Sequence, residues 1–83
     1  MMGYDKDKVD DATLALIYLV TWKQKKEFPW SAWKSFDWDT MDRLHQKGLI
    51  SDPKSKAKSV VLSDEGFQHA ERLFQKMFGK EET

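Results

Sequence analysis

Residues 47–66, KGLISDPKSKAKSVVLSDEG, constrain the fold of this 83-residue chain more than any other stretch. Two short apolar segments, Leu49 to Ser51 and Ser59 to Leu62, flank a polar segment that begins with Asp52-Pro53. Short runs rich in apolar and β-branched residues, separated by turn-forming residues, are typical of a hairpin. The stretch therefore predicts two β-strands joined by a seven-residue loop that carries lysines at its tip.

A helix is predicted on each side of this hairpin. Before it, Asp37 suits the N-cap of a helix from Trp38 to Lys47, and Gly48 suits the left-handed residue that follows a helix. After it, Ser63 suits the N-cap of the last helix. Apolar residues of that helix recur at spacings of three and four, which places them on one face: Phe67, Ala70, Leu73, Phe74, Met77 and Phe78. The stretch thus lies between two well-delimited helices.

The first helix is predicted from Asp7 to Lys26. Acidic residues lie at its start and lysines at its end, which is the order that the helix dipole favours. Its centre, Leu14 to Val20, is apolar at every position and so covers the whole circumference. We expect this helix to be buried on more than one side, either at the centre of the domain or in a dimer seam.

An aromatic segment, PWSAWKSFDWD, follows the stop signal Phe28-Pro29. Ser31 is a candidate cap for one or two turns of helix in this segment. We expect most of the chain's four tryptophans to fill a small core. Trp is also enriched at interface hot spots, so Trp30 and Trp33, together with Tyr18 on the first helix, are candidate protein-interaction residues.

The order of these elements predicts an α+β, mainly α fold that is winged-helix-like, with three helices, a two-stranded β-hairpin wing and a C-terminal helix. One domain is expected to span residues 1–83, with frayed ends at 1–6 and 80–83. The segment LHQKGLISDPKSKAKSVVLSDEG resembles the recognition-helix end, wing and next helix start of MarR-like regulators. Residues 38–78 carry this resemblance, which implies the shape more than the use.

A second resemblance covers nearly the whole chain. The segments DKVDDATLALIYL and AWKSFDWDTMDRLHQKGLISDPKSKAKSVVLSDEG, together with the length, resemble a family of small bacterial proteins of unassigned function. This resemblance implies a free-standing bacterial protein and brings no catalytic or binding residues with it.

DNA binding is one of two functional interpretations. The helix 38–47 would enter the major groove and the wing would contact phosphates. The residues that would do so are Arg43, His45, Gln46 and Lys47 near base edges, and Lys54, Lys56 and Lys58 on the backbone. Against this, the helix start carries Asp37, Asp39 and Asp42, and the chain has 14 basic and 14 acidic residues, hence no net charge to attract DNA. We expect DNA to be the less favoured partner.

The favoured interpretation is a non-catalytic module that binds an unknown protein or a second copy of itself. His45 and His69 are the chain's two histidines, and they lack the spacing of a metal or catalytic motif. Asp37, Asp39 and Asp42 lack the loop and glycine of a calcium site. We therefore expect no enzyme activity, no cofactor, no metal and no small-molecule substrate.

A soluble cytoplasmic location is expected as well. The chain has no cysteine, so nothing in it requires an oxidising compartment. Its longest apolar run, Leu14 to Val20, falls far short of the roughly 20 residues that cross a bilayer, and its start, MMGYDKDKVDD, is acidic where a signal peptide would be basic. No membrane association is predicted.

Overall fold

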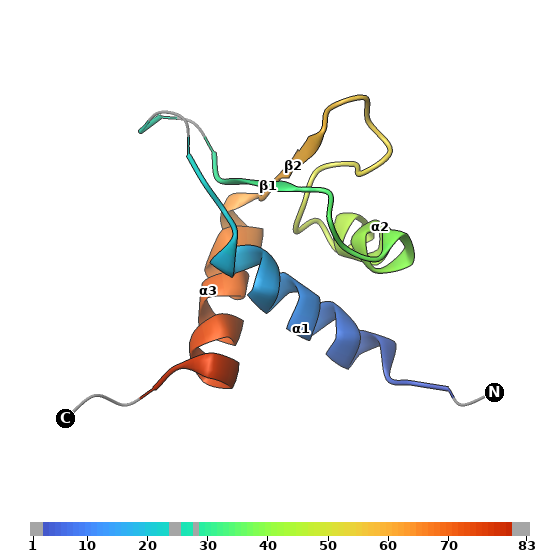
Figure 1. Ribbon diagram of the computed structural model, residues 1–83, viewed down its shortest axis with the longest axis vertical. Helices are drawn as coiled ribbons and strands as arrows, with labels where there is room; N and C mark the ends of the chain where they lie inside the picture. Colours follow the sequence, from blue (N-terminus) through green and yellow to red (C-terminus); the bar gives the residue numbers. More distant parts are fainter. Residues whose placement is uncertain (1–2, 24–25, 28, 81–83) are drawn as a thin grey trace.

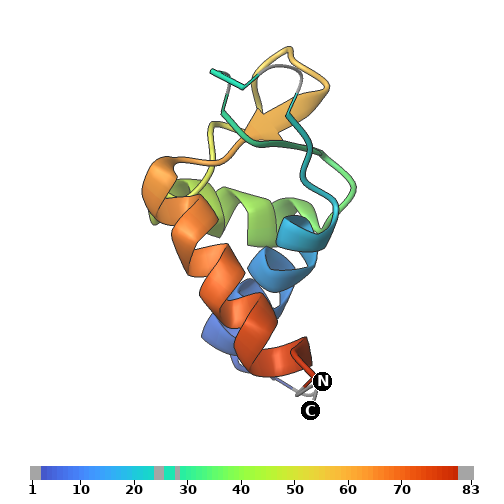
Figure 2. The same ribbon diagram turned by 90° about the vertical axis from the view of Figure 1, so that its left-hand side faces the viewer.

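A computed structural model describes residues 3–23, 26–27 and 29–80, and in these the chain forms three helices and a two-stranded antiparallel sheet (Figure 1). The elements in order are α1 (Lys6–Leu19), β1 (Ser31–Trp33), α2 (Trp38–Gln46), β2 (Ser59–Val61) and α3 (Asp64–Phe78). In the turned view the helices occupy one end of the molecule, and the strands and loops occupy the other (Figure 2). The predicted α+β, mainly α class is confirmed, and the layout is consistent with a winged helix.

The predicted end of the first helix is wrong, because α1 stops at Leu19 and not at Lys26. Directly after it, the Thr21 hydroxyl donates to the Tyr18 carbonyl at 2.8 Å. Trp22 then forms an antiparallel bridge with Ser31, with both backbone N–H···O bonds at 2.9 Å. These are β-branched and aromatic residues, which suit extended backbone, and the bridge competes successfully with a further helical turn.

The start of α1 lies one residue earlier than predicted. Asp5 is the N-cap, and its side chain accepts a hydrogen bond from the Lys8 backbone N–H at 3.1 Å. Of the ends expected to fray, residues 1–2 and 81–83 lie outside the described residues.

The short helix predicted at Ser31 is also wrong, because Ser31–Trp33 form the strand β1. This strand pairs antiparallel with β2, so that Ser31 lies opposite Val61 and Trp33 opposite Ser59. Its side chains alternate as expected for a strand with one covered face, since Ala32 is fully buried and Trp33 is exposed. The partner strand lies some thirty residues away in sequence, so local cap and turn signals did not reveal it.

The predicted hairpin is present in reduced form. Its second strand is β2, but the first is shortened to a bridge between Ile50 and Leu62. The Ser51 backbone N–H supports this bridge by donating to the Val61 carbonyl at 2.8 Å. The main partner of β2 is therefore β1, and the lysine-bearing loop between Ser51 and Ser59 extends away from the helices (Figure 1).

The predicted caps of α2 and α3 are confirmed. The Asp37 carboxylate accepts from the Thr40 backbone N–H at 3.1 Å, and the Ser63 hydroxyl accepts from the Gly66 backbone N–H at 2.9 Å. After α2, Gly48 adopts a φ of 77°, in the left-handed region that favours glycine. These local signals therefore set where both helices begin and where α2 ends.

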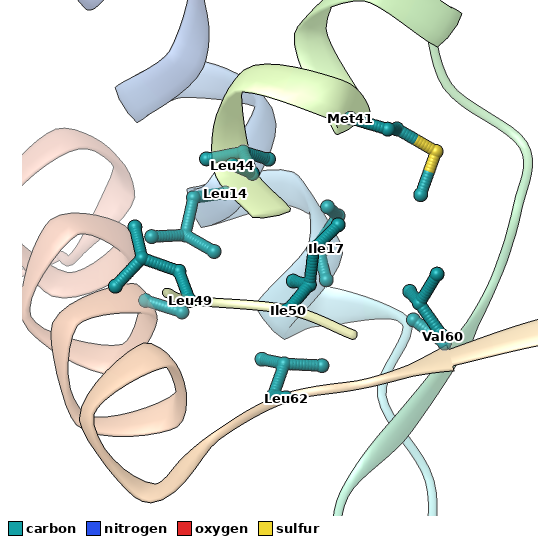
Figure 3. Packing of buried hydrophobic residues seen from close by; sticks show 10 residues of the cluster. Leu14, Ile17, Met41, Leu44, Leu49, Ile50, Val60 and Leu62 are labelled. Atoms are coloured by element: carbon teal, nitrogen blue, oxygen red, sulfur yellow. The ribbon is translucent and has the colours of Figure 1, made fainter. Parts of the chain in front are cut away.

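The core lies where α1, α2, the strands and the start of α3 meet (Figure 3). Its buried side chains point toward one another from all of these elements: Leu14, Ile17, Ala32, Met41, Leu44, Leu49, Ile50, Val60, Leu62 and Ala70. No tryptophan belongs to this buried set among the described residues, although Trp22 packs against it. The expectation that most of the tryptophans fill the core is therefore wrong, because Trp33 and Trp38 are exposed and Trp22 and Trp30 are only partly buried.

Candidate interaction site

Two tryptophan side chains are exposed near the start of α2. Trp33 is 55% exposed at the end of β1, and Trp38 is 59% exposed in the first turn of α2. The Trp33 ring lies against the Trp22 ring, with their centroids 4.8 Å apart, which limits how freely the indole moves. Trp33 was predicted to bind a partner, whereas Trp38 was not among the predicted interaction residues. The first turn of α2 extends past the core, which leaves Trp38 outside it.

The other two predicted interaction residues are occupied inside the fold. The Trp30 ring stacks on Phe67 with centroids 4.9 Å apart and planes 5° apart, and the Lys23 ammonium lies 5.2 Å from the centre of the Trp30 ring. The Tyr18 ring contacts Phe67 and Phe74 at 5.4 and 5.3 Å. Both rings are partly buried. Their packing joins α1, through Tyr18, and the residue before β1, Trp30, to α3.

The Tyr18 hydroxyl makes one further contact with α3, donating to the Glu71 carboxylate at 3.3 Å. The pKa of Tyr18 is raised, mainly because the phenol is partly buried and to a lesser extent because the charge of Glu71 lies beside it. The phenol therefore stays neutral at physiological pH and acts as a hydrogen-bond donor.

A cleft of about 310 Å³ opens beside the Trp30 and Phe67 rings, at the start of α3. Leu62, Ser63 and Asp64 contribute to its wall. The Ser63 hydroxyl is already used, because it caps α3 and donates to the Gly48 carbonyl at 2.8 Å. The cleft therefore combines an aromatic wall with charged and polar side chains, those of Lys23, Glu27, Asp64 and Gln68.

An ion-pair cluster around the buried carboxylate of Asp10 joins α1 to α2. The Asp10 carboxylate is fully buried and receives the Arg43 Nε at 2.8 Å, the Arg43 Nη2 at 2.7 Å and the Lys47 Nζ at 2.9 Å. Arg43 also donates to the Thr40 hydroxyl at 3.2 Å, and Lys47 reaches Asp7 at 3.1 Å. The cluster therefore ties the last turns of α2 to the first turns of α1.

The two partners determine the charge state of Asp10. Burial acts to raise the pKa of the Asp10 carboxyl, but hydrogen bonds from Arg43 and Lys47, with their charges, outweigh burial and lower it. The same bonds raise the pKa of Lys47 and of Arg43. All three groups are therefore charged at neutral pH. Asp10 was missed in the sequence, although its spacing of four from Leu14 and seven from Ile17 places it on the inward face of α1.

This cluster predicts a specific response to acid. Because the Asp10 pKa is lower in the folded than in the unfolded chain, its contribution to stability is present above about pH 4 and is lost as the pH falls toward the folded pKa. We expect Asp10→Asn to lower stability at pH 7 by on the order of 2 kcal/mol. Thermal melts between pH 7 and pH 2 should also show an acid limb, the fall of the melting temperature with falling pH, that is less steep for this variant.

The control is Asp39→Asn, which changes an exposed carboxylate at the start of α2. It should leave the stability at pH 7 nearly unchanged. Equal acid limbs in the native chain and the Asp10→Asn variant would contradict the assigned role of the ion pair.

Apart from His45, the predicted nucleic-acid-binding residues form separate groups. Arg43 and Lys47 are held by Asp10, as described above, and Gln46 is exposed. The other three, Lys54, Lys56 and Lys58, are exposed on the loop between Ser51 and Ser59. Of these, the Lys54 ammonium lies 3.8 Å from the Asp42 carboxylate on α2. Arg43, Lys47 and Lys54, which lie on or beside α2, are thus already paired with acids.

Residues 5–80 of the chain match the family described as a domain of unknown function, DUF6429. The chain belongs to this family. It is also similar to the uncharacterized protein y4hR of Sinorhizobium fredii (strain NBRC 101917 / NGR234), being 51% identical over 77 residues, which are 93% of this chain and 97% of that protein. No solved structure matches the chain. The expected membership in a small bacterial family of unassigned function is confirmed.

The DUF6429 match spans all helices and strands described above. Within the part of the chain that the structure describes, no group of three or more histidine and acidic side chains is placed to hold a metal ion. His45 directs its Nδ1 at the Ile50 carbonyl, 3.1 Å away. None of the helices in the described ranges combines the length and the hydropathy that crossing a bilayer requires.

Proposed function

We propose that this DUF6429 protein is a non-catalytic interaction module that binds a protein partner through exposed apolar side chains. The exposure of Trp33 and Trp38, at 55% and 59%, is the observation that supports this proposal. Large indoles left in water are unfavourable for a free protein, and tryptophan is among the residues that dominate binding energy at interfaces. Trp33 is also held in place by Trp22, which lowers the entropy that binding would cost.

The proposal assigns no catalysis, because the ionisable groups that lie closest together satisfy one another. Asp10 is fully buried, and its oxygens already accept bonds from Arg43 and Lys47. A general acid or base must reach a proton of the substrate, and a carboxylate enclosed in this way cannot. The cluster is therefore best explained as a link between α1 and α2.

Site-specific photo-crosslinking tests the proposed tryptophan surface. A photoreactive phenylalanine analogue replaces Trp33 or Trp38 in cells that produce the chain, and the control places it at the exposed Gln75 on α3. We expect both tryptophan positions to capture the same protein, identified by mass spectrometry, and Gln75 not to capture it.

The captured protein is then purified and titrated with the native chain. The double variant Trp33→Ala and Trp38→Ala should bind at least about tenfold more weakly, as expected for two hot-spot residues. Unchanged affinity in this variant, or the absence of any shared adduct, would contradict the proposal.

DNA binding is the second candidate, supported by the three exposed lysines on the protruding loop. With Arg43 and Lys47 paired to Asp10, phosphate contact by Lys54, Lys56 and Lys58 is the main attraction that remains. Binding should then be weak, strong only at low salt and indifferent to sequence. Changing all three lysines to glutamine should abolish it in a fluorescence-anisotropy titration. Tight binding at physiological salt that discriminates between duplexes would instead place DNA first.

A further inference from the structure

We propose that α1 pairs with α1 of a second copy of this chain, antiparallel, along its outward face. This inference goes beyond the proposed function, because it assigns a second contact surface, distinct from Trp33 and Trp38, and names the partner that binds there. The contact surface, here called the outer seam, consists of Val9, Ala12, Leu16 and Leu19.

The outer seam lies opposite the buried face of α1. Each helical residue turns the chain by about 100°, so Leu16 points away from Leu14, which is fully buried. Leu16 and Leu19 are 41% and 63% exposed, and Val9 and Ala12 are partly exposed. α3 contacts a different side of α1, where Tyr18 packs on Phe67 and Phe74. An apolar face thus remains on a helix whose other sides are used by the fold.

The spacing of the seam suits a second helix. Its four residues are separated by three, four and three positions, which is the alternation of the a and d positions of a heptad. None of the four is charged or polar. Residues with this spacing form a straight stripe about 15 Å long, which matches the contact length of a short helix pair.

The side chains of the seam fit a copy of themselves in the antiparallel direction. When the two helices run in opposite directions, Ala12 can face Leu16 of the other copy, and Val9 can face Leu19. Each small residue then receives a large one, as in the interdigitated packing of facing helices. A two-fold axis repeats both contacts, so one seam supplies both sides of the interface.

The helix dipoles favour the same direction. An antiparallel pair places the N-terminal end of one α1 beside the C-terminal end of the other, so that the two dipoles oppose each other. A parallel pair would place like ends of the dipoles side by side. The seam is short, so we expect a dissociation constant on the order of 10 to 100 µM.

Sedimentation equilibrium of the purified chain tests the association. We expect a shift from monomer toward dimer as the concentration rises through this range. Leu16→Lys places a charge in the seam and should weaken association at least about tenfold, while melting of the dilute protein should show that it still folds. Gln75→Lys, on exposed α3, is the matched control and should associate like the native chain.

Cysteine trapping tests the direction, because the chain has no cysteine of its own. In the antiparallel seam, a mixture of the Ala12→Cys chain and the Leu16→Cys chain should oxidise to a mixed covalent dimer faster than either variant alone. Faster trapping of each variant with itself would overturn the antiparallel arrangement. A native chain that stays monomeric at high concentration would overturn the inference altogether. That result would leave the proposed function standing if Trp33 and Trp38 still capture a shared partner.

Discussion

Replacing Gly66 with alanine is expected to prevent stable folding. Gly66 lies in the first turn of α3, and a Cβ added there would overlap the carbonyl oxygen of Leu49. That carbonyl cannot easily move, because it accepts the Ser63 backbone N–H at 3.1 Å. The clash is with backbone and not with a flexible side chain, so relief would require separating α3 from the segment that enters the loop. We expect a loss of about 3 kcal/mol or more, measured by chemical denaturation.

The chain offers graded controls for this variant. An added Cβ at Gly3 meets nothing within 4 Å, so Gly3→Ala should leave stability nearly unchanged. Gly48 also has open space, but its φ of 77° disfavours a side chain, so Gly48→Ala should cost about 1 kcal/mol. If Gly66→Ala is no more costly than Gly48→Ala, then α3 does not pack on Leu49 as described.

Ile17→Ala is expected to have the second large effect. The Ile17 side chain is fully buried and points into the cluster formed by α1, α2 and the strands (Figure 3). Its truncation leaves a cavity that rigid neighbours fill only in part. The expected loss is about 2 to 5 kcal/mol, a large share of the stability of a domain of this size.

Leu16→Ala is the matched control for Ile17→Ala, because the two residues are adjacent on α1. Leu16 is 41% exposed, so its truncation should cost less than about 1 kcal/mol in dilute protein. If both variants lose the same stability, the register of α1 against the core is wrong, and the outer seam is wrong with it.

Local signals in the sequence were sufficient to predict where α2 and α3 begin and where α2 ends. A cap such as Asp37 or Ser63 acts on the backbone three residues later, and Gly48 accepts a positive φ, so each signal is readable within one turn. These signals predicted the order of the three main helices and the position of β2, but not that the strand before the loop is reduced to the bridge between Ile50 and Leu62.

The end of α1 and the strand β1 were not predicted, because both depend on backbone pairing between segments that are distant in the sequence. Trp22 bridges to Ser31, and Ser31 in turn lies opposite Val61, so the end of α1 and the whole of β1 depend on a partner far along the chain. Without that partner, Ser31 resembled a helix cap. The same pairing turns Trp33 outward. The expectation of a buried tryptophan failed there because the sequence did not reveal this pairing.

The candidate surfaces were predicted only in part from the sequence. The unbroken apolar run Leu14 to Val20 indicated a helix with more than one covered side, but only the packing shows that Leu16 and Leu19 form the outer face. Three-dimensional contacts were also needed to show that Arg43 and Lys47 bind Asp10. Their charges looked available because the partner lies on another helix.

The central claim is that this protein associates through exposed apolar side chains, at Trp33 and Trp38 with a protein partner and at the outer face of α1 with its own copy, and not through the lysines of its protruding loop. Backbone amide NMR spectra, recorded as the chain is concentrated and again after duplex DNA is added at physiological salt, test this claim most directly. We expect concentration to shift the amides of Val9, Ala12, Leu16 and Leu19, while those of Lys54, Lys56 and Lys58 stay in place in both experiments. Spectra that do not change with concentration, but shift at the loop lysines and at α2 when DNA is added, would contradict the account.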